Sequence, residues 1–457
     1  MKRYLTGIDW IIHAINHINK KKTGAGNMFQ IVLQMEGALD ETILRECLNK
    51  FVKKFPVLNG RSMRDYNLAP YWKIYSKEKM LPPNVRTYRL DDNAAFSKVL
   101  STLEQGINKS FNSVREHLAF HLIYAGKTSF LAVVFDHCLF DARGAEVFLN
   151  MLQQEQKNET DYSNRISLAE SAHLCKWKEK FEAGKWVNRK LLQLSENKSR
   201  FLPLHSVSEK KFRFKIISLD ERQTSAIIDT AYNEAGYLMF MPHTLAISIQ
   251  VLHSIFTKRD ICTGDYIVPV SIDTRPVEKV AQEVFFNHMS FFLIRVKANE
   301  ADSFPVLLQS IKQQIYDQIK SNLPADIEKA SLLMRIVPLP ILGYLMRLPL
   351  KGQIASFCFS YTGEAAYNSP MFMEKKINNI FHMPRVPIPP GLGIFFSRFQ
   401  GKLNVTFSYL DGMLENEEID SVVHTLQSRL GTHPDPLLGR EGTFAPSLSR
   451  EGGRGMS

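Results

Sequence analysis

Apolar positions change their spacing between residues 128 and 152 of the chain. Residues 128–135 form a near-continuous apolar run, which is typical of a strand buried on both faces. Residues 144–152 then show the helical spacing of apolar positions. The pattern therefore predicts a strand, a short loop and a helix, with His137 and Asp141 in the loop.

Two other segments repeat the order of a strand followed by an amphipathic helix. Residues 28–35 predict a strand, and the helix after it begins at Asp40, a favoured N-cap residue. In the second half, residues 211–217 predict a strand and residues 220–232 a helix that ends before Gly236. We therefore expect an α+β protein made of two similar lobes.

Length and composition divide the chain into four parts. With 457 residues, the chain is long enough for two lobes that each bury a core. We expect an N-terminal lobe over residues 1–175, a crossover linker over 176–208 and a C-terminal lobe over 209–431. Residues 432–457 are rich in Gly, Ser and Arg without an apolar period, so we expect a disordered tail.

His137 is the candidate catalyst. A histidine at a strand end can act as a general base, because its ordinary pKa lies near working pH. The alternative is a histidine with a purely structural role, and the His-x-x-x-Asp motif alone does not decide between them. Cys138 could be proposed as a nucleophile, but beside an apolar strand end we expect a buried, inert thiol.

The motif takes its meaning from other landmarks that occur in a fixed order. These landmarks are residues 5–10, 29–40, 51–61, 137–144, 268–276, 286–290, 359–363 and 393–409. In this order they resemble the superfamily of thioester-dependent acyltransferases with the chloramphenicol acetyltransferase fold, which includes condensation domains, alcohol acetyltransferases and wax-ester synthases. In that family the motif reads HHxxxDG. Here Asp136 replaces the first histidine, and Ala142 replaces the glycine, which recurs only at Gly144.

The resemblance implies two chloramphenicol acetyltransferase-like lobes, each a mixed β-sheet with flanking helices, and an active-site tunnel between them. It also implies direct acyl transfer from a thioester to an alcohol or amine, with His137 as the general base. Asp141 would pair with Arg275 in a structural ion pair, and Gly144 would support the turn. The alternative is that Asp141 orients the imidazole, as in a hydrolase triad.

Three polar residues are candidates for contacts to the substrate or its pantetheine arm: Asn287, Ser360 and Thr362. Each of them could instead make a structural hydrogen bond within a strand.

Charge and composition narrow the partners. The net charge of +11 would attract the phosphates of coenzyme A, an acidic acyl carrier protein or an anionic membrane, although a solvated basic face is the plainer explanation. No nucleic-acid motif accompanies the charge, so we expect no nucleic-acid partner. Residues 332–350 are apolar but interrupted by prolines and arginines, which indicates a buried interface segment or a lip that touches lipid.

We expect no permanently bound cofactor and no metal, with acyl-coenzyme A or acyl-pantetheine as the donor and a small molecule as the acceptor. Five widely spaced cysteines and the lack of an apolar leader favour the cytoplasm, with peripheral membrane contact as an option. The second lobe favours a monomer with an internal tunnel. Two other classes compete with this interpretation. One is a dihydrolipoyl acyltransferase core, favoured only by the Asp136-His137 pair. The other is a non-catalytic condensation-like module that binds a carrier protein or lipid.

Overall fold

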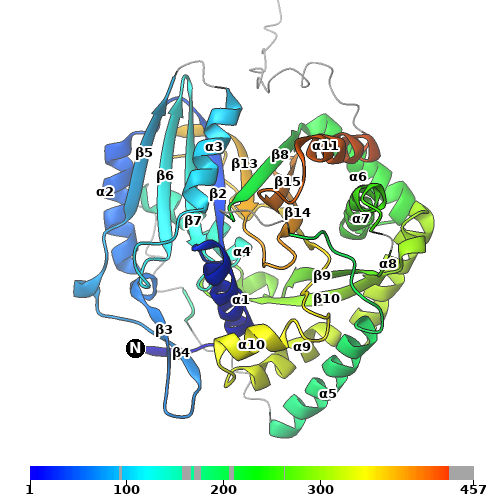
Figure 1. Cartoon of the computed structure of the whole chain (residues 1–457). Coiled ribbons are helices and arrows are strands. Elements are labelled where there is room, and N and C mark those ends of the chain that lie inside the picture. Colours follow the sequence, from blue (N-terminus) through cyan, green and yellow to red (C-terminus); the bar gives the residue numbers. More distant parts are fainter. Residues whose placement is uncertain (92–94, 157–165, 169–175, 205–209, 262, 432–457) are drawn as a thin grey trace, which may run out of the picture.

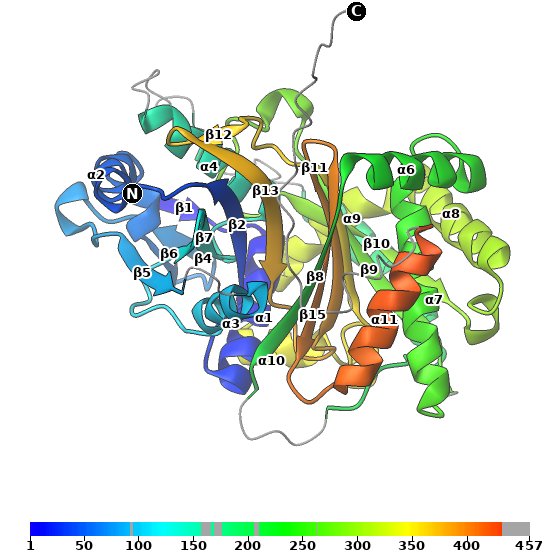
Figure 2. The ribbon, with the colours of Figure 1, turned by 90° about the horizontal axis from the view of Figure 1, so that it is seen from above.

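A computed structural model describes residues 1–91, 95–156, 166–168, 176–204, 210–261 and 263–431. Two six-stranded sheets stand side by side in it, each with helices on its outer side (Figures 1 and 2). The expected α+β class with two lobes is confirmed. The helices are α1 (Gly7–Thr23), α2 (Glu41–Phe51), α3 (Phe96–Ile107), α4 (Ala142–Gln156), α5 (Trp177–Leu194), α6 (Glu221–Ala235), α7 (Phe240–Lys258), α8 (Phe304–Lys320), α9 (Leu323–Ser331), α10 (Leu339–Leu345) and α11 (Asn416–Arg429).

Both sheets mix parallel and antiparallel pairs. The first contains, in spatial order, β12 (Met371–Phe372), β13 (Lys375–Pro384), β2 (Met28–Glu36), β7 (Thr128–Asp136), β6 (Leu118–Ala125) and β5 (Asn84–Leu90). The second contains β10 (Met289–Val296), β9 (Tyr266–Asp273), β11 (Cys358–Glu364), β14 (Leu392–Phe399), β15 (Lys402–Leu410) and β8 (Phe212–Leu219). A third, small sheet joins β1 (Lys2–Tyr4), β4 (Pro70–Lys73) and β3 (Arg61–Arg64).

The predicted local elements are present. Asp40 caps α2 by accepting from the amide nitrogen of Thr42 at 2.8 Å, and Gly236 ends α6 with a φ of 104°. Strand β7 is buried over nearly its whole length, as its apolar run predicts, because sheet neighbours and helices cover it. A helix also lies in the expected linker, where α5 packs against α9. The predicted disorder of residues 432–457 lies outside the described residues.

The second half of the chain contributes two strands to the first sheet. β12 and β13 come from the range that we expected to form the C-terminal lobe, yet they extend the first sheet beyond β2 (Figure 2). On its other side β13 faces β15: Asn404 donates to the carbonyl of Ile380 at 2.9 Å and Thr406 to that of His382 at 2.7 Å. Residues 209–431 therefore contribute to both sheets, and side-chain hydrogen bonds between β13 and β15 join the lobes.

A second crossing segment lies next to the end of β7. The amide nitrogen of Phe286 donates to the carbonyl of Leu139 at 2.6 Å, and Phe140 forms a parallel bridge with Phe286. The ring of Phe286 is buried and packs against Trp72. This docking places Asn287, the next residue, beside the loop after β7.

Among the described residues no single helix has both the length and the apolar composition that crossing a membrane requires. Helices α6 and α7 reach these values only as a pair that is bent by 93°.

Candidate active site

His137 follows the last residue of β7, where the chain leaves the sheet. Its amide nitrogen donates to the carbonyl of Asn27 at 3.1 Å, and its ring meets that of Phe29 edge-on, with 5.3 Å between centroids. Part of the residue stays accessible. The strand end and the segment between α1 and β2 therefore fix the backbone of His137 without covering it.

The side chain of Asn287 fixes the imidazole ring. Its Nδ2 donates to the carbonyl of His137 at 3.0 Å and faces Oδ1 of Asp9 at 3.5 Å, so its Oδ1 points at Nδ1 of His137, 3.1 Å away. Because an amide oxygen only accepts, Nδ1 must carry the proton in the neutral ring. The lone pair then lies on Nε2, which makes no hydrogen bond within the described part of the chain.

Asp9 holds Asn287 from behind. Its carboxylate is fully buried and accepts from the amide nitrogen of Asn287 at 3.0 Å, from that of Thr6 at 2.9 Å and from Nη1 of Arg3 at 3.2 Å. Burial alone would raise the pKa of Asp9, but the charge of Arg3 and these hydrogen bonds keep it below the ordinary value. A buried chain from Arg3 through Asp9 and Asn287 thus positions His137.

Asp141 points away from the imidazole and forms an ion pair with Arg275. Nη2 of Arg275 donates to both carboxylate oxygens at 2.8 and 2.7 Å, and the amide nitrogens of His288 and Gly144 donate at 2.9 Å each. Burial would raise the pKa of Asp141, but the charge of Arg275 holds it below the usual value. The alternative in which Asp141 orients the imidazole is therefore wrong, because Asn287 occupies Nδ1.

Gly144 is required for close packing and not for a turn. A Cβ atom at this position would lie 2.1 Å from the carbonyl oxygen of Val284, in the segment that crosses from the second lobe. Ala142, which stands where the family motif has glycine, begins α4 with no positive φ. Alanine therefore fits at position 142, since the chain is already helical there.

Asp136, the residue before His137, pairs with a second histidine. Its Oδ2 lies 2.8 Å from Nδ1 of His117, whose Nε2 lies 2.9 Å from the carbonyl of Gly60. Burial would raise the pKa of Asp136, but the hydrogen bond to His117 and its charge bring it to about 2. The adjacent Cys138 is buried, which raises the pKa of its thiol well above the ordinary value. Cys138 is thus unsuited to act as a nucleophile.

The pKa of His137 lies below its ordinary value. Burial lowers it, and the charge of Asp141 opposes the change without cancelling it. At neutral pH the ring is therefore uncharged, with a lone pair on Nε2 that can accept a proton.

The residues expected to contact substrate lie in different surroundings. Asn287 is only 5% exposed and its side chain contacts His137; its expected contact with substrate stays a prediction. Ser360 accepts from the hydroxyl of Ser271 at 3.0 Å, and the hydroxyl of Thr362 lies 3.4 Å from the carbonyl of Phe396. Both remain partly exposed on β11, and their contact with substrate stays a prediction.

Sequence reasoning missed Asp9, Arg3 and His117. Thr6 and Asp9 have the spacing of a capping box, which the structure contains at the start of α1, and that spacing indicates a helix cap and not a contact with Asn287. The role of Asp9 toward Asn287 depends on two residues 278 positions apart.

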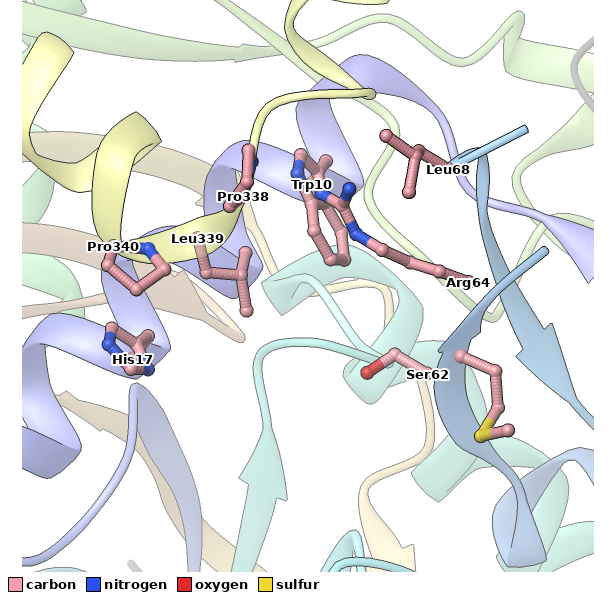
Figure 3. A pocket seen from close by; sticks show the side chains of 9 residues that line it. Trp10, His17, Ser62, Arg64, Leu68, Pro338, Leu339 and Pro340 are labelled. Atoms are coloured by element: carbon pink, nitrogen blue, oxygen red, sulfur yellow. The ribbon is translucent and has the colours of Figure 1, made fainter. Parts of the chain in front are cut away.

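An open, mainly apolar pocket of about 530 Å³ lies beside α1, between Trp10 and His17 (Figure 3). Trp10 and Arg64 form one wall, with the guanidinium 4.7 Å from the ring centroid, and residues 338–340 form another. None of the predicted site residues lines it. Residues 332–350 are partly buried against α1 at Leu342 and Gly343 but expose Ile341, Tyr344 and Leu348.

The described residues contain no cluster of side chains suited to bind a metal ion. Over the described ranges, no group of three or more His, Cys, Asp or Glu side chains could hold a metal ion.

Comparison with known proteins gives the fold but not a sequence family. A scan of family models and a search of curated sequences found no match. Among solved structures, the TRI3 trichothecene 15-O-acetyltransferase from Fusarium sporotrichioides is 11% identical and covers 94% of this chain and 95% of its own, with a TM-score of 0.67. The first condensation domain of the calcium-dependent antibiotic synthetase is 13% identical over 94% and 96%, with a TM-score of 0.68.

A third similar structure is neither an acetyltransferase nor a condensation domain. The epimerization domain from the third module of tyrocidine synthetase B is 14% identical and covers 94% of this chain and 97% of its own, with a TM-score of 0.56. At such identities the likeness establishes a shared fold, and the reaction must be argued from the site.

Proposed function

We propose that this chain, which has the two-lobed chloramphenicol acetyltransferase-like fold, is an acyltransferase that uses thioester donors. It moves an acyl group from coenzyme A or a pantetheinyl carrier to an alcohol or amine acceptor, and His137 is the general base. The observation that carries the proposal is the uncharged imidazole whose Nδ1 is held by Asn287 while Nε2 is left without a partner.

The reaction follows from this geometry in two steps. Nε2 of His137 removes the proton of the acceptor hydroxyl or amine as its oxygen or nitrogen attacks the thioester carbonyl. The tetrahedral intermediate then collapses and expels the thiolate. The thiolate accepts from the imidazolium the proton that Nε2 had removed from the acceptor. Nothing becomes bonded to the enzyme, and the products are the ester or amide and the free thiol. General-base assistance of this kind contributes about 10² to 10⁴ in rate.

The charges around His137 suit such a proton shuttle. Burial keeps the ring neutral before reaction, whereas the carboxylate of Asp141 favours the imidazolium that forms during it. Oδ1 of Asn287 continues to accept from Nδ1 in both states. The ring therefore keeps its orientation while its charge changes, so little reorganisation accompanies proton transfer.

The donor and acceptor would meet at His137 between the lobes. The segment 284–287 brings part of the second half of the chain to the loop that carries His137, and β13 adds another part of that half to the same sheet, beyond β2. This arrangement supports the proposed tunnel, and the partly exposed hydroxyls of Ser360 and Thr362 remain our candidates for contacts to the intermediate or the pantetheine arm.

A membrane surface or an acyl carrier protein is the proposed partner of the α10 region. The exposed Ile341, Tyr344 and Leu348 stand next to Arg347 and Lys351, a combination of apolar and basic groups that suits an anionic interface. Sedimentation with anionic vesicles tests the membrane option: Tyr344→Ser with Leu348→Ser should weaken binding, and equal binding would contradict it.

A panel of acyl thioesters, offered with alcohols and amines, tests the proposed activity by the release of free thiol. We expect release that depends on the acceptor for at least one donor. If no donor is consumed, the non-catalytic module that binds a carrier protein or lipid replaces this proposal.

A further inference from the structure

His117 has a hydrogen-bond acceptor at each of its two ring nitrogens. Its Nε2 lies 2.9 Å from the carbonyl oxygen of Gly60, and its Nδ1 lies 2.8 Å from Oδ2 of Asp136. Carbonyl and carboxylate oxygens only accept hydrogen bonds, so both nitrogens must carry a proton. In this arrangement His117 is an imidazolium, and it forms an ion pair with the carboxylate of Asp136.

The alternative is a neutral His117 whose Nδ1 accepts a hydrogen bond from a protonated Asp136. Two features of Asp136 oppose it. The amide nitrogen of Cys138 donates to Oδ1 at 3.0 Å, and a hydrogen bond to a carboxylate favours its charged form. The pKa of Asp136 also lies at about 2. Asp136 is therefore ionised at neutral pH, and the shared proton stays on the ring.

An indole ring and a second histidine enclose the pair. His117 is 4% exposed, and its ring centroid lies 4.8 Å from that of Trp72. His13 packs against the same indole, with 6.1 Å between centroids. Burial lowers the pKa of His13 to about 4, and the opposing charges of Asp9 and Lys20, both on α1, also act on it. His13 is thus neutral, and the positive charge of this cluster lies on His117.

Asp136 fixes the turn that carries the proposed base. Its amide nitrogen donates to the carbonyl of His117 at 3.0 Å, and its Oδ1 accepts from the amide nitrogen of Cys138. Its own carbonyl accepts from the amide nitrogen of Leu139 at 2.9 Å. These bonds hold the backbone on both sides of His137. His117 therefore acts on His137 through the one residue that lies between them.

The charge of His117 also affects the protonation of His137. The negative charge of Asp136 raises the pKa of His137 and so works against the burial that keeps this ring neutral. A cation paired with the carboxylate reduces that effect, because the two charges largely cancel at a distance. Without His117, Asp136 would favour the charged form of the base more strongly.

We propose that His117 is a positioning residue: as an imidazolium it holds Asp136, and through Asp136 it fixes the turn of His137 and helps to keep the base uncharged. The inference rests on the proposed function only for its effect on rate, since the protonation of both rings can be measured without turnover. Asp136 replaces the first histidine of the family motif, and the ion pair gives this replacement a role in the site.

Nuclear magnetic resonance of the full chain with ¹⁵N-labelled histidine tests the state of His117. At neutral pH we expect two ring N–H protons for this residue, one on Nδ1 and one on Nε2, because both nitrogens donate. The two signals are assigned by their loss in His117→Gln. A single ring proton on His117 at neutral pH would overturn the proposal.

Titration of His137 in the same spectra tests the effect on the base. His117→Gln removes the positive charge and leaves the carboxylate, so the midpoint for His137 should rise by about 0.5–1.5 pH units. Asp136→Asn keeps both hydrogen bonds, because its oxygen accepts from Cys138 while its Nδ2 donates to Nδ1 of a neutral His117. The midpoint should fall in this variant. A purely structural role predicts no opposite shifts, and unchanged midpoints in both variants would overturn the proposal.

His253→Gln is the matched control. His253, on α7, also lies between two partners: Nδ1 is 2.8 Å from the hydroxyl of Tyr266, and Nε2 is 3.1 Å from Oδ1 of Asp302. Its loss should leave the midpoint of His137 unchanged. If His117→Gln does not fold, Asp136→Asn carries the test, and a midpoint that rises or stays unchanged there would overturn the proposal.

Kinetics links the measurement to the proposed reaction. His117→Gln should lower kcat several-fold with little change in KM, and the acid limb of kcat/KM should move to higher pH by as much as the midpoint of His137 moves. An acid limb that stays in place in an active variant would overturn the proposal. If the wild type releases no thiol from any donor, the proposed function fails, whereas the two ring protons of His117 and the shifts of His137 would still be found.

Discussion

Asn287 holds Nδ1 of His137 through an oxygen 3.1 Å away, although the two residues are 150 positions apart in the chain. The contact joins the lobes at the atom that decides the tautomer of the base. It depends on Asp9, which accepts from the backbone of Asn287, and on the docking of Phe286 against Leu139. The chemistry of His137 is thus coupled to the packing of one lobe on the other.

Asn287→Ala should slow the reaction without abolishing it. The variant loses the acceptor for Nδ1 of His137, so the imidazolium that forms in the transition state is less stabilised. A hydrogen bond to a charged group contributes about 1.5–3 kcal/mol, which corresponds to a fall in kcat of about 10- to 100-fold. Steady-state kinetics checks this, with the exposed Asn67→Ala as the control; an unchanged kcat would remove Asn287 from the positioning network.

Asp141→Asn should primarily affect stability. It leaves Arg275 buried opposite a neutral amide, and breaking a buried ion pair in this way costs about 3–5 kcal/mol. Urea unfolding of the two proteins at neutral pH measures the difference. The pKa of Asp141 is lowered, so its contribution is complete above its ordinary pKa of 3.8 and is lost as pH falls through the lower, folded value. The gap between the two proteins should therefore narrow in acid, and a gap that widens there would be inconsistent with the ion pair.

Gly144→Ala should destabilise the contact between the lobes. The added Cβ would lie 2.1 Å from the carbonyl oxygen of Val284, so the backbone must shift. Overpacking of this kind costs about 1–3 kcal/mol, which the midpoint of thermal unfolding reports. Gly184→Ala, in helix α5, is the matched control. Its added Cβ would meet only the flexible end of the Leu333 side chain, 3.1 Å away. Equal midpoints for the two variants would contradict the close approach at Gly144.

The pH dependence of activity should show a neutral base. Since burial lowers the pKa of His137, kcat/KM should rise with pH through a value below 6.5 and then stay level through neutral pH. Initial rates over a pH series give the curve. A limb that rises only above pH 7 would mean that the imidazolium is favoured in the free enzyme, in conflict with the site described here.

The sequence predicted what is local and missed what joins distant segments. The strand, loop and helix around His137 follow from the periodicity of one continuous stretch, and Asp40 and Gly236 mark helix ends by residue type. The position of β13 in the first sheet has no such signal, because the apolar pattern of a strand does not identify its neighbour.

The same difference holds for the site. The family resemblance suggested the pair of Asp141 and Arg275, whereas nothing in the sequence predicted that Asn287 contacts His137, since an exposed and a buried amide look alike in sequence. Asp9 reads locally as a helix cap, and only the fold places it against Asn287.

The direct test of the account is free-thiol release by wild type and His137→Ala, with the donor and acceptor that the wild type uses. His424→Ala, on the exposed face of α11, controls for the loss of a histidine. We predict that His137→Ala lowers acceptor-dependent release about 10²- to 10⁴-fold while His424→Ala leaves it unchanged. Equal release by the wild type and His137→Ala would show that this imidazole is not the base.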